Sequence, residues 1–130
     1  MTPNRETVTA LNAPAAVGPY SHAVVSNGLL FCSGQVALDP ASGELVGATP
    51  AEQARQCLTN LGAVCAAAGA KLADAVRVTV WLLDMGDFVA VNEVYATFFD
   101  DAPPARVTIA VAGLPKGAAI EIDAVVALPD

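Results

Sequence analysis

The sequence is poor in charge, and above all in positive charge. Charged residues make up 15% of its 130 positions, and thirteen acids outnumber six lysines and arginines, which leaves a net charge of −7. A nucleic-acid-binding protein needs clustered basic residues that displace counterions from phosphates. The bases here are isolated along the chain, so the composition argues against DNA or RNA as a partner. A bound anion needs one cation placed in a local site.

Cysteine and histidine are also scarce. Cys32, Cys57 and Cys65 form no CxxC pair, and each lies in an apolar stretch, where free cysteine behaves as a small buried hydrophobe. His22 is the only histidine. So few ligands predict no metal site, and no glycine-rich phosphate loop indicates a nucleotide cofactor. We therefore expect a protein without cofactors, in a reducing compartment.

Long hydrophobic runs are absent too. No apolar stretch reaches the roughly 20 residues that cross a bilayer, and residues 1–10 lack the apolar centre of a signal peptide. These observations predict a cytoplasmic protein with no membrane partner. Hydrophobic residues nevertheless make up 55% of the chain, more than a small monomer buries by itself. We expect part of this apolar surface to lie between subunits.

Turn and cap residues mark the first half of the fold. Asn27-Gly28 stands between two apolar runs and predicts a hairpin of Ala23–Ser26 with Leu29–Cys32. Thr49-Pro50-Ala51-Glu52 supplies an N-cap, a proline at the first helical position and a glutamate three residues after the cap. This capping box predicts the start of a helix, and Gly69 predicts its end.

The second half combines strands with one more helix. Alternating or β-branched residues predict the remaining strands at Glu6–Leu11, Val76–Leu83, Arg106–Ala112 and Ile120–Leu128. A second helix carries an apolar stripe over residues 88–98, is capped by Asp84 or Asp87, and stops at Pro103-Pro104. We expect the last two strands to pair. The order predicts an α+β fold, a mixed sheet with both helices on one face.

All 130 residues are assigned to one domain, with residues 1–5 as a frayed lead.

In the predicted strand Val76–Leu83, the helices are expected to cover the alternate residues Val76, Val78, Val80 and Leu82. Trp81 then lies on the opposite face of the sheet. Another subunit is the expected source of its cover.

Arg106 begins an otherwise apolar strand, and a guanidinium fits a carboxylate through two parallel hydrogen bonds. Alternation places Arg106 and Thr108 on one face of this strand, and Glu121 and Asp123 on the polar face of the last strand. If the two strands are neighbours, Arg106, Thr108 and Glu121 line one pocket. The alternative is a plain cross-strand ion pair, which contributes little. Spacing alone does not separate the two.

Several short segments extend this pattern. They are Gly18-Pro19-Tyr20-Ser21, Ser33-Gly34-Gln35, Asn92, Pro104-Ala105-Arg106 and Leu114-Pro115-Lys116 with Ile120-Glu121-Ile122. In this order and spacing, over residues 12–128, the sequence resembles the Rid family, the reactive intermediate deaminases also called the YjgF family. The resemblance implies a chorismate-mutase-like fold and a homotrimer with an active site in each cleft between subunits. It also implies hydrolysis of enamines and imines to 2-oxo acids and ammonia.

The resemblance implies three catalytic residues. Arg106 matches the family arginine that binds the substrate carboxylate. Tyr20 matches the pocket tyrosine, and Glu121 matches the glutamate that positions the attacking water.

It further implies four substrate-binding residues. Ser33 and Asn92 match supporting polar residues, and Gly34 matches a glycine that permits close approach of the backbone. Thr108 replaces a common cysteine whose backbone amide contacts the substrate, a role that survives the change. His22 stands where the family often has glutamine. A lone histidine beside a pocket is more often a hydrogen-bonding wall residue than a catalyst.

The predicted function is therefore hydrolytic deamination of small 2-imino acids, like that of a 2-iminobutanoate/2-iminopropanoate deaminase, without metal or cofactor. The alternative is a non-catalytic trimer that binds a 2-oxo acid or another small carboxylate through Arg106. Glu121 and Asn92 favour the enzyme, because a carboxylate sensor needs no acid to position water. Ribonuclease activity, attached to some relatives, is disfavoured by the acidic charge.

Overall fold

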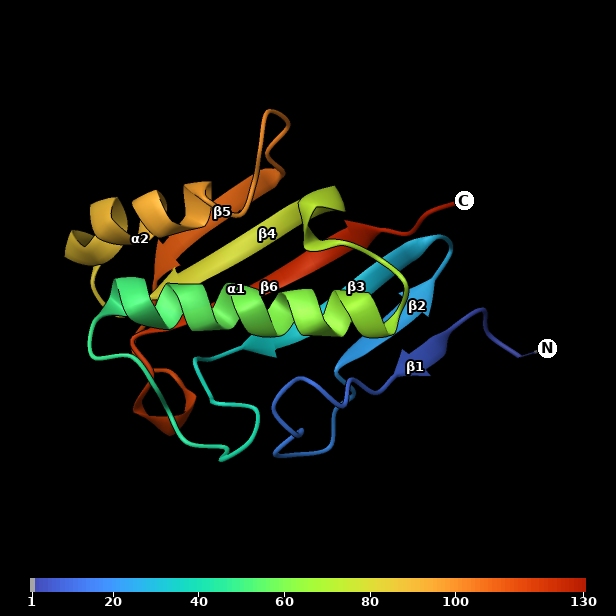
Figure 1. The fold of residues 1–130 in the computed structure, drawn as a ribbon, viewed down its shortest axis with the longest axis horizontal. Coiled ribbons are helices and arrows are strands. Elements are labelled where there is room, and N and C mark those ends of the chain that lie inside the picture. Colours follow the sequence, from blue (N-terminus) through green and yellow to red (C-terminus); the bar gives the residue numbers. More distant parts are fainter. Residues whose placement is uncertain (1) are drawn as a thin grey trace.

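The computed structural model describes residues 2–130, which form one six-stranded sheet with two helices over one face (Figure 1). The strands are β1 Glu6–Val8, β2 Ala23–Ser26, β3 Leu29–Gln35, β4 Ala75–Leu82, β5 Ala105–Ala110 and β6 Ile120–Ala127. The helices are α1 Pro50–Ala67 and α2 Phe88–Ala96, and short 3₁₀ turns cover Leu72–Asp74, Met85–Asp87 and Pro115–Gly117. The predicted α+β fold with both helices on one face is confirmed.

The N-terminal segment differs from its prediction in two ways. Of the lead that was predicted to fray, Met1 lies outside the described residues, and Asn4 is bonded to the β2–β3 hairpin: its carbonyl accepts from the Ser26 hydroxyl at 2.6 Å. The first strand ends at Val8, short of its predicted end. It ends there because the Ala10 N–H donates to a histidine ring instead of to a neighbouring strand.

The predicted β2–β3 hairpin forms around Asn27-Gly28, whose φ angles of 52° and 79° suit a two-residue turn. Strand β3 continues past its predicted end at Cys32 as far as Gln35. Its pairing with β6 shifts register between these two residues, so that Ser33 and Gly34 together face one residue of β6. A β-bulge of this kind redirects side chains, often next to a functional site.

Helix α1 begins at the predicted cap. The Thr49 hydroxyl accepts a hydrogen bond from the Glu52 N–H at 3.2 Å, and Pro50 is the first helical residue. The Glu52 carboxylate accepts from the Ala48 N–H at 2.9 Å instead of from the cap residue itself, so the box is not reciprocal. Before α2, Asp84 caps the preceding 3₁₀ turn by accepting from a backbone N–H.

The strand order is β1-β2-β3-β6-β4-β5. The prediction that the last two strands pair is wrong, because β4 lies between them, antiparallel to β6 and parallel to β5. Helix α2 connects β4 to β5, and such a crossover returns the chain parallel to the strand it left. Strand β5 is therefore an edge of the sheet.

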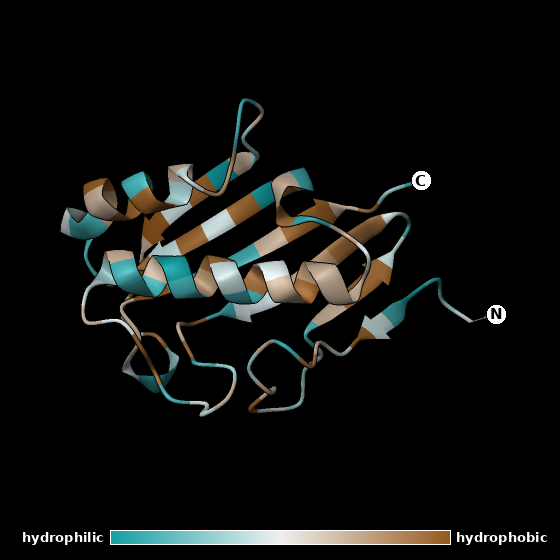
Figure 2. Ribbon diagram, viewed as in Figure 1, coloured by the Kyte–Doolittle hydropathy of each residue, from teal (hydrophilic) through white to brown (hydrophobic). Residues whose placement is uncertain are grey.

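The covered face of β4 follows the predicted alternation except at Val76. A register shift between Ala75 and Arg77 places Ala75 in the core and leaves Val76 45% exposed. The face of the sheet away from the helices remains open. Its pairing register places large apolar side chains there: Phe31, Trp81, Val107, Ile109 and Val125. Figure 2 shows the hydrophobic and hydrophilic residues alternating along the strands.

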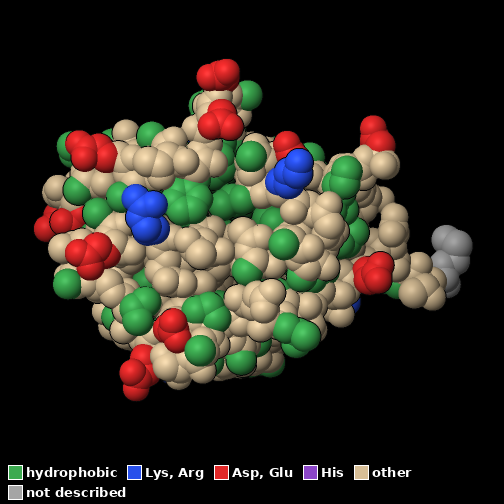
Figure 3. Space-filling model, in the orientation of Figure 1, with side chains coloured by type: hydrophobic (Ala, Val, Ile, Leu, Met, Phe, Trp, Pro, Cys, Tyr) green, Lys and Arg blue, Asp and Glu red, His purple; other side chains and the backbone are tan. Residues whose placement is uncertain are grey.

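Charged groups are spread over the surface. On the face that carries the helices, the basic side chains are isolated from one another (Figure 3), which offers no continuous basic patch for phosphates. The three cysteines are buried and free, as predicted. Within residues 2–130, neither helix combines the length and hydropathy needed to cross a bilayer.

Candidate functional site

The predicted site residues fall into two groups within one chain. The first, the Arg106 cluster, contains Asn92, Arg106 and Thr108. The second, the Glu121 pocket, includes Tyr20, Ser33, Gly34 and Glu121. Arg106 and Thr108 pair with β4 residues that face the helices, whereas Glu121 pairs with Trp81 on the open face. The single pocket and the ion pair between Arg106 and Glu121 that we considered from the sequence therefore do not form within one chain.

The Arg106 guanidinium is held against α2. Its Nη1 donates to the Asn92 Oδ1 at 2.7 Å, and its central carbon lies 4.6 Å from the ring centre of Tyr95 and 5.4 Å from that of Phe88. Aromatic faces attract the cation and fix its plane. Within residues 2–130 its other N–H groups make no hydrogen bond, so the guanidinium retains the donors that a carboxylate needs.

Two hydroxyls belong to the same region and lack partners. The Tyr95 Oη and Thr108 Oγ1 atoms are buried with no hydrogen bond inside the described part of the chain. Burial raises the pKa of the Tyr95 hydroxyl, and the Arg106 charge acts in the opposite direction. Tyr95 belongs to the apolar stripe that the sequence predicts over residues 88–98, and no role beside Arg106 was predicted for it. Its three-residue spacing from Asn92, which places both on one face of α2, is the signal that was available.

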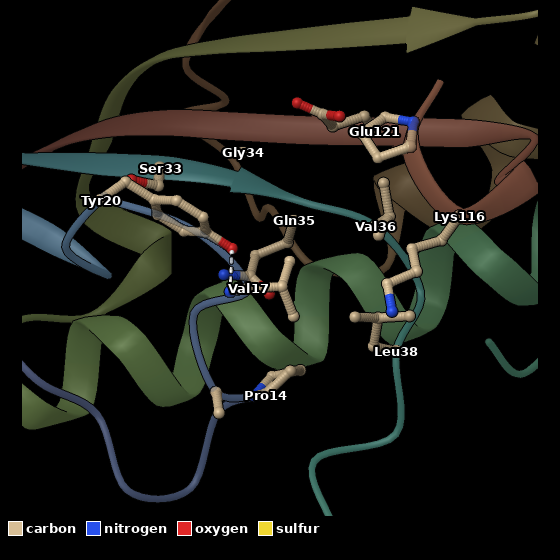
Figure 4. A pocket seen from close by; sticks show the side chains of 12 residues that line it. Pro14, Val17, Tyr20, Ser33, Gly34, Gln35, Val36, Leu38, Lys116 and Glu121 are labelled. Atoms are coloured by element: carbon tan, nitrogen blue, oxygen red, sulfur yellow. Dashed lines mark hydrogen bonds between the residues drawn. The ribbon is translucent and has the colours of Figure 1, made fainter. Parts of the chain in front are cut away.

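The Glu121 pocket is a cavity of about 310 Å³ between the segment of residues 14–20, the β3 bulge and the Pro115–Gly117 turn (Figure 4). Its apolar walls come from Pro14, Val17, Val36 and Leu38. Its polar groups come from Tyr20, Ser33, Gln35, Lys116 and Glu121. An apolar cavity with a few converging polar groups is the usual form of a small-molecule site.

Gly34 provides the space in which the Glu121 carboxylate lies. A Cβ built on Gly34 would overlap a carboxylate oxygen of Glu121 and lie 3.0 Å from its carboxyl carbon. Burial raises the pKa of Glu121, and the negative charge of Asp123 raises it further. A carboxyl group whose pKa is shifted toward neutrality can accept and return a proton.

Tyr20 and Ser33 are held by the backbone around them. The Tyr20 hydroxyl accepts from the Val17 N–H at 3.3 Å (dashed in Figure 4), so its own proton is free to donate into the pocket. The Ser33 hydroxyl donates to the Ser21 carbonyl at 2.6 Å. This bond ties the β3 bulge to the segment that carries Tyr20.

His22 makes hydrogen bonds, as predicted, but it supports the loop next to the Glu121 pocket and is not part of the pocket wall. Its Nδ1 accepts from the Ala10 N–H at 2.9 Å, and its Nε2 lies 2.7 Å from the Pro14 carbonyl. Together these contacts require a neutral ring with the proton on Nε2. His22 does not line the pocket itself, but it fixes Pro14, which does.

Gly34→Ala is expected to reduce turnover of the substrate about tenfold or more while the protein stays folded. The added methyl group displaces the Glu121 carboxylate, which the family resemblance implies positions the attacking water, and a displacement of about 1 Å in such a group has a large kinetic cost. Turnover and thermal unfolding of the purified variant measure the two effects.

Gly62→Ala is the matched control, because a Cβ on Gly62 meets open space. This change in the middle of α1 is expected to stabilise the fold by about 0.5–1 kcal/mol and to leave turnover unchanged. Undiminished turnover in Gly34→Ala would show that turnover does not depend on the position of the Glu121 carboxylate.

The sequence matches a known protein family over most of its length. Residues 10–128 match the family model described as endoribonuclease L-PSP. The chain is 50% identical over 123 residues to a RutC family protein of Sinorhizobium fredii, covering 95% of this chain and 98% of the relative. It is 46% identical over 121 residues to the 2-iminobutanoate/2-iminopropanoate deaminase of Homo sapiens, covering 93% and 88% of the two chains.

The fold has the same relatives. The crystal structure of RidA from an Antarctic Psychrobacter superimposes with a TM-score of 0.91 at 40% identity, over 95% of this chain and 99% of that one. The family model spans nearly the whole sequence, and the relatives match it almost end to end. The chain therefore belongs to the endoribonuclease L-PSP family, also called the YjgF or Rid family.

Proposed function

We propose that this protein hydrolyses reactive 2-imino acids to 2-oxo acids and ammonia, in a site assembled between copies of the chain. The observation that carries the proposal is a pair of complementary groups: the Arg106 guanidinium with free donors, and the Glu121 carboxyl with a raised pKa. Relatives that are 46% identical carry the name 2-iminobutanoate/2-iminopropanoate deaminase, which supports the same substrate class here.

The two groups need a second copy of the chain in order to meet. Arg106 lies on the edge strand β5, and Glu121 lies two strands away on β6. The open sheet face carries large apolar side chains, with Phe31 and Ile109 45% and 42% exposed, and such side chains favour burial against another subunit. In a closed ring of three copies, Arg106 of one copy completes the Glu121 pocket of the next.

Arg106 orients the substrate in this proposal. Two parallel hydrogen bonds from the guanidinium hold the carboxylate, and Asn92 with the Tyr95 ring keeps the guanidinium from turning. Fixing the imino acid in this way converts an encounter with water into a reaction within one complex, and orientation of this kind can supply several kcal/mol.

Glu121 handles the proton. The ionised carboxylate takes a proton from water as the water oxygen attacks the imine carbon, and it passes that proton to the nitrogen to give an adduct with a hydroxyl and an amino group on one carbon. Glu121 then takes the hydroxyl proton and delivers it to the amino nitrogen. As the carbon–oxygen double bond forms, the carbon–nitrogen bond breaks, ammonia leaves with the electron pair, and the 2-oxo acid remains. The free proton of the Tyr20 hydroxyl supplies a further hydrogen bond in the pocket.

The Arg106 cluster is complete within one chain, and this observation favours one other candidate, a non-catalytic protein that binds 2-oxo acids. Such a protein has no use for the space that Gly34 leaves for the Glu121 carboxylate, or for the raised pKa of Glu121. These two features favour the enzyme.

The proposal is tested by generating imines in place. An amino-acid oxidase converts alanine, 2-aminobutanoate or leucine to the imine, and semicarbazide traps what is not hydrolysed. The protein is expected to lower the rate of trapping in proportion to its concentration. Unchanged trapping for all three imines contradicts the proposal, and calorimetry with 2-oxo acids then tests the binding protein.

A further inference from the structure

Helix α1 carries a buried carboxamide that belongs neither to the Arg106 cluster nor to the lining of the Glu121 pocket. Gln53 lies near the start of the helix, and 7% of the residue is exposed. Its Nε2 donates to the Gly47 carbonyl at 3.2 Å, and its Oε1 accepts from the Ala119 N–H at 2.9 Å. Both partners are main-chain groups of fixed polarity, so the amide has one orientation and joins two segments that are far apart in the chain.

The first of these segments is the connection between β3 and α1. It contributes Val36 and Leu38 to the walls of the Glu121 pocket, and its two arms pair at Leu38 and Leu45. Gly47 belongs to the same connection and has a φ of 101°. A Cβ on Gly47 would lie 3.0 Å from the Gln53 Cγ. The glycine therefore allows both the backbone conformation and the close packing of Gln53 at this wall.

The second segment is the Pro115–Gly117 turn, whose first two residues line the pocket. Lys116 has a φ of 61°, in the left-handed region that residues other than glycine seldom adopt. Such a conformation persists only where its surroundings fix it. The bond from the Ala119 N–H to Gln53 restrains the chain between this turn and Glu121, which follows Ala119 by two residues.

Gln53 holds the start of β6 at the point where regular sheet pairing stops. The pairing of β6 with β4 ends at Ile120, and beyond it the Leu83 N–H donates to the Ala119 carbonyl at 3.3 Å. The bond from the Ala119 N–H to Gln53 is the shorter of the two at this peptide. A shift of the Ala119 peptide moves the first residues of β6 with it, and Glu121 is the second of them.

On the basis of the proposed function, we propose that Gln53 is a positioning residue, which fixes the Glu121 carboxylate for reaction without touching the substrate. An apolar replacement leaves the Gly47 carbonyl and the Ala119 N–H without partners in the interior. The start of β6 then moves, and a misplacement of about 1 Å can reduce a rate by about 100-fold. Binding is affected less, because Arg106 of a neighbouring copy holds the substrate carboxylate.

Gln53→Met tests this assignment, because it keeps the length of the side chain and removes both bonds. The imine of 2-aminobutanoate is made in place by an amino-acid oxidase and trapped with semicarbazide. The kcat of the variant is expected to fall about tenfold or more, and the Kd of 2-oxobutanoate, measured by calorimetry, to change by less than about threefold. Gln56→Met is the matched control, because it removes a carboxamide of the same helix that bonds the Asn60 side chain. This control is expected to keep the wild-type kcat.

Each result decides the assignment. If Gln53→Met unfolds at a lower temperature but keeps the wild-type kcat, or if kcat and binding fall in parallel, Gln53 acts only on the fold, and the deaminase function still stands. Equal losses of kcat in Gln53→Met and Gln56→Met have the same meaning. If Gln53→Met does not fold, Gly47→Ala displaces the Gln53 side chain without removing it, and an unchanged kcat in that variant overturns the assignment. If the wild type does not hydrolyse the imine, the proposed function fails and this inference fails with it.

Discussion

Arg106→Ala is expected to lower kcat/KM for imine hydrolysis by about 100- to 1,000-fold, through the loss of a charged, two-bond contact to the substrate carboxylate. The side chain is exposed at the sheet edge, so its removal leaves no buried cavity. The circular dichroism spectrum and the number of subunits in the assembly are therefore expected to match those of the wild type. Initial rates of imine hydrolysis at several substrate concentrations measure the loss.

Arg55→Ala provides the matched control for this change. The Arg55 guanidinium also stacks on an aromatic ring of the same region, 5.9 Å from the centre of Phe98, but it lines neither candidate cluster. This variant is expected to keep full activity. Equal losses in Arg55→Ala and Arg106→Ala would mean that the cation acts on the fold or on the net charge. Full activity in Arg106→Ala would remove it from the site.

Glu121→Gln is expected to lower kcat by about 100-fold or more, since general acid–base groups typically contribute 10²–10⁴-fold. The substitution keeps the size of the side chain, so the packing against Gly34 persists. Binding of a 2-oxo acid, measured by calorimetry, is expected to change by only a few fold, because Arg106 holds the carboxylate. A parallel loss of binding and turnover would assign Glu121 to substrate binding instead of proton transfer.

Asp123→Asn tests the charge of Glu121 without removing it. Burial is the main cause of the raised pKa of Glu121, and the negative charge of Asp123 is the second. If Glu121 works as an ionised base, kcat/KM falls as the pH drops through its pKa. Removing the Asp123 charge lowers that pKa, so the acid limb of the pH profile is expected to move to lower pH. An unmoved limb would show that another group titrates there.

Local features of the fold were predictable from the sequence. The φ values of Asn27-Gly28 depend on two residues, and the cap at Thr49 depends on a few neighbours, so both form as expected. The position of β6 between β3 and β4 depends on contacts between residues far apart in the chain. Alternation in Ile120–Ala127 shows which face is buried, but it does not reveal which strands lie on either side.

The candidate site was predictable in part for the same reason. The resemblance identified Arg106 and Glu121, but their separation within one chain follows from the strand order, which no local pattern encodes. The family resemblance implied that Gly34 permits close approach of the backbone. In the structure, the Glu121 carboxylate is the group that lies close to Gly34.

The most direct test of the account is to mix Arg106→Ala and Glu121→Gln subunits by coexpression and assay imine hydrolysis. Each variant alone is expected to be nearly inactive. If the copies form the proposed ring and mix at random, about a quarter of the sites combine an intact Arg106 from one copy with an intact Glu121 from the next. The mixture is therefore expected to regain about a quarter of the wild-type activity. Activity no higher than that of the single variants would contradict a site in which Arg106 and Glu121 come from different copies.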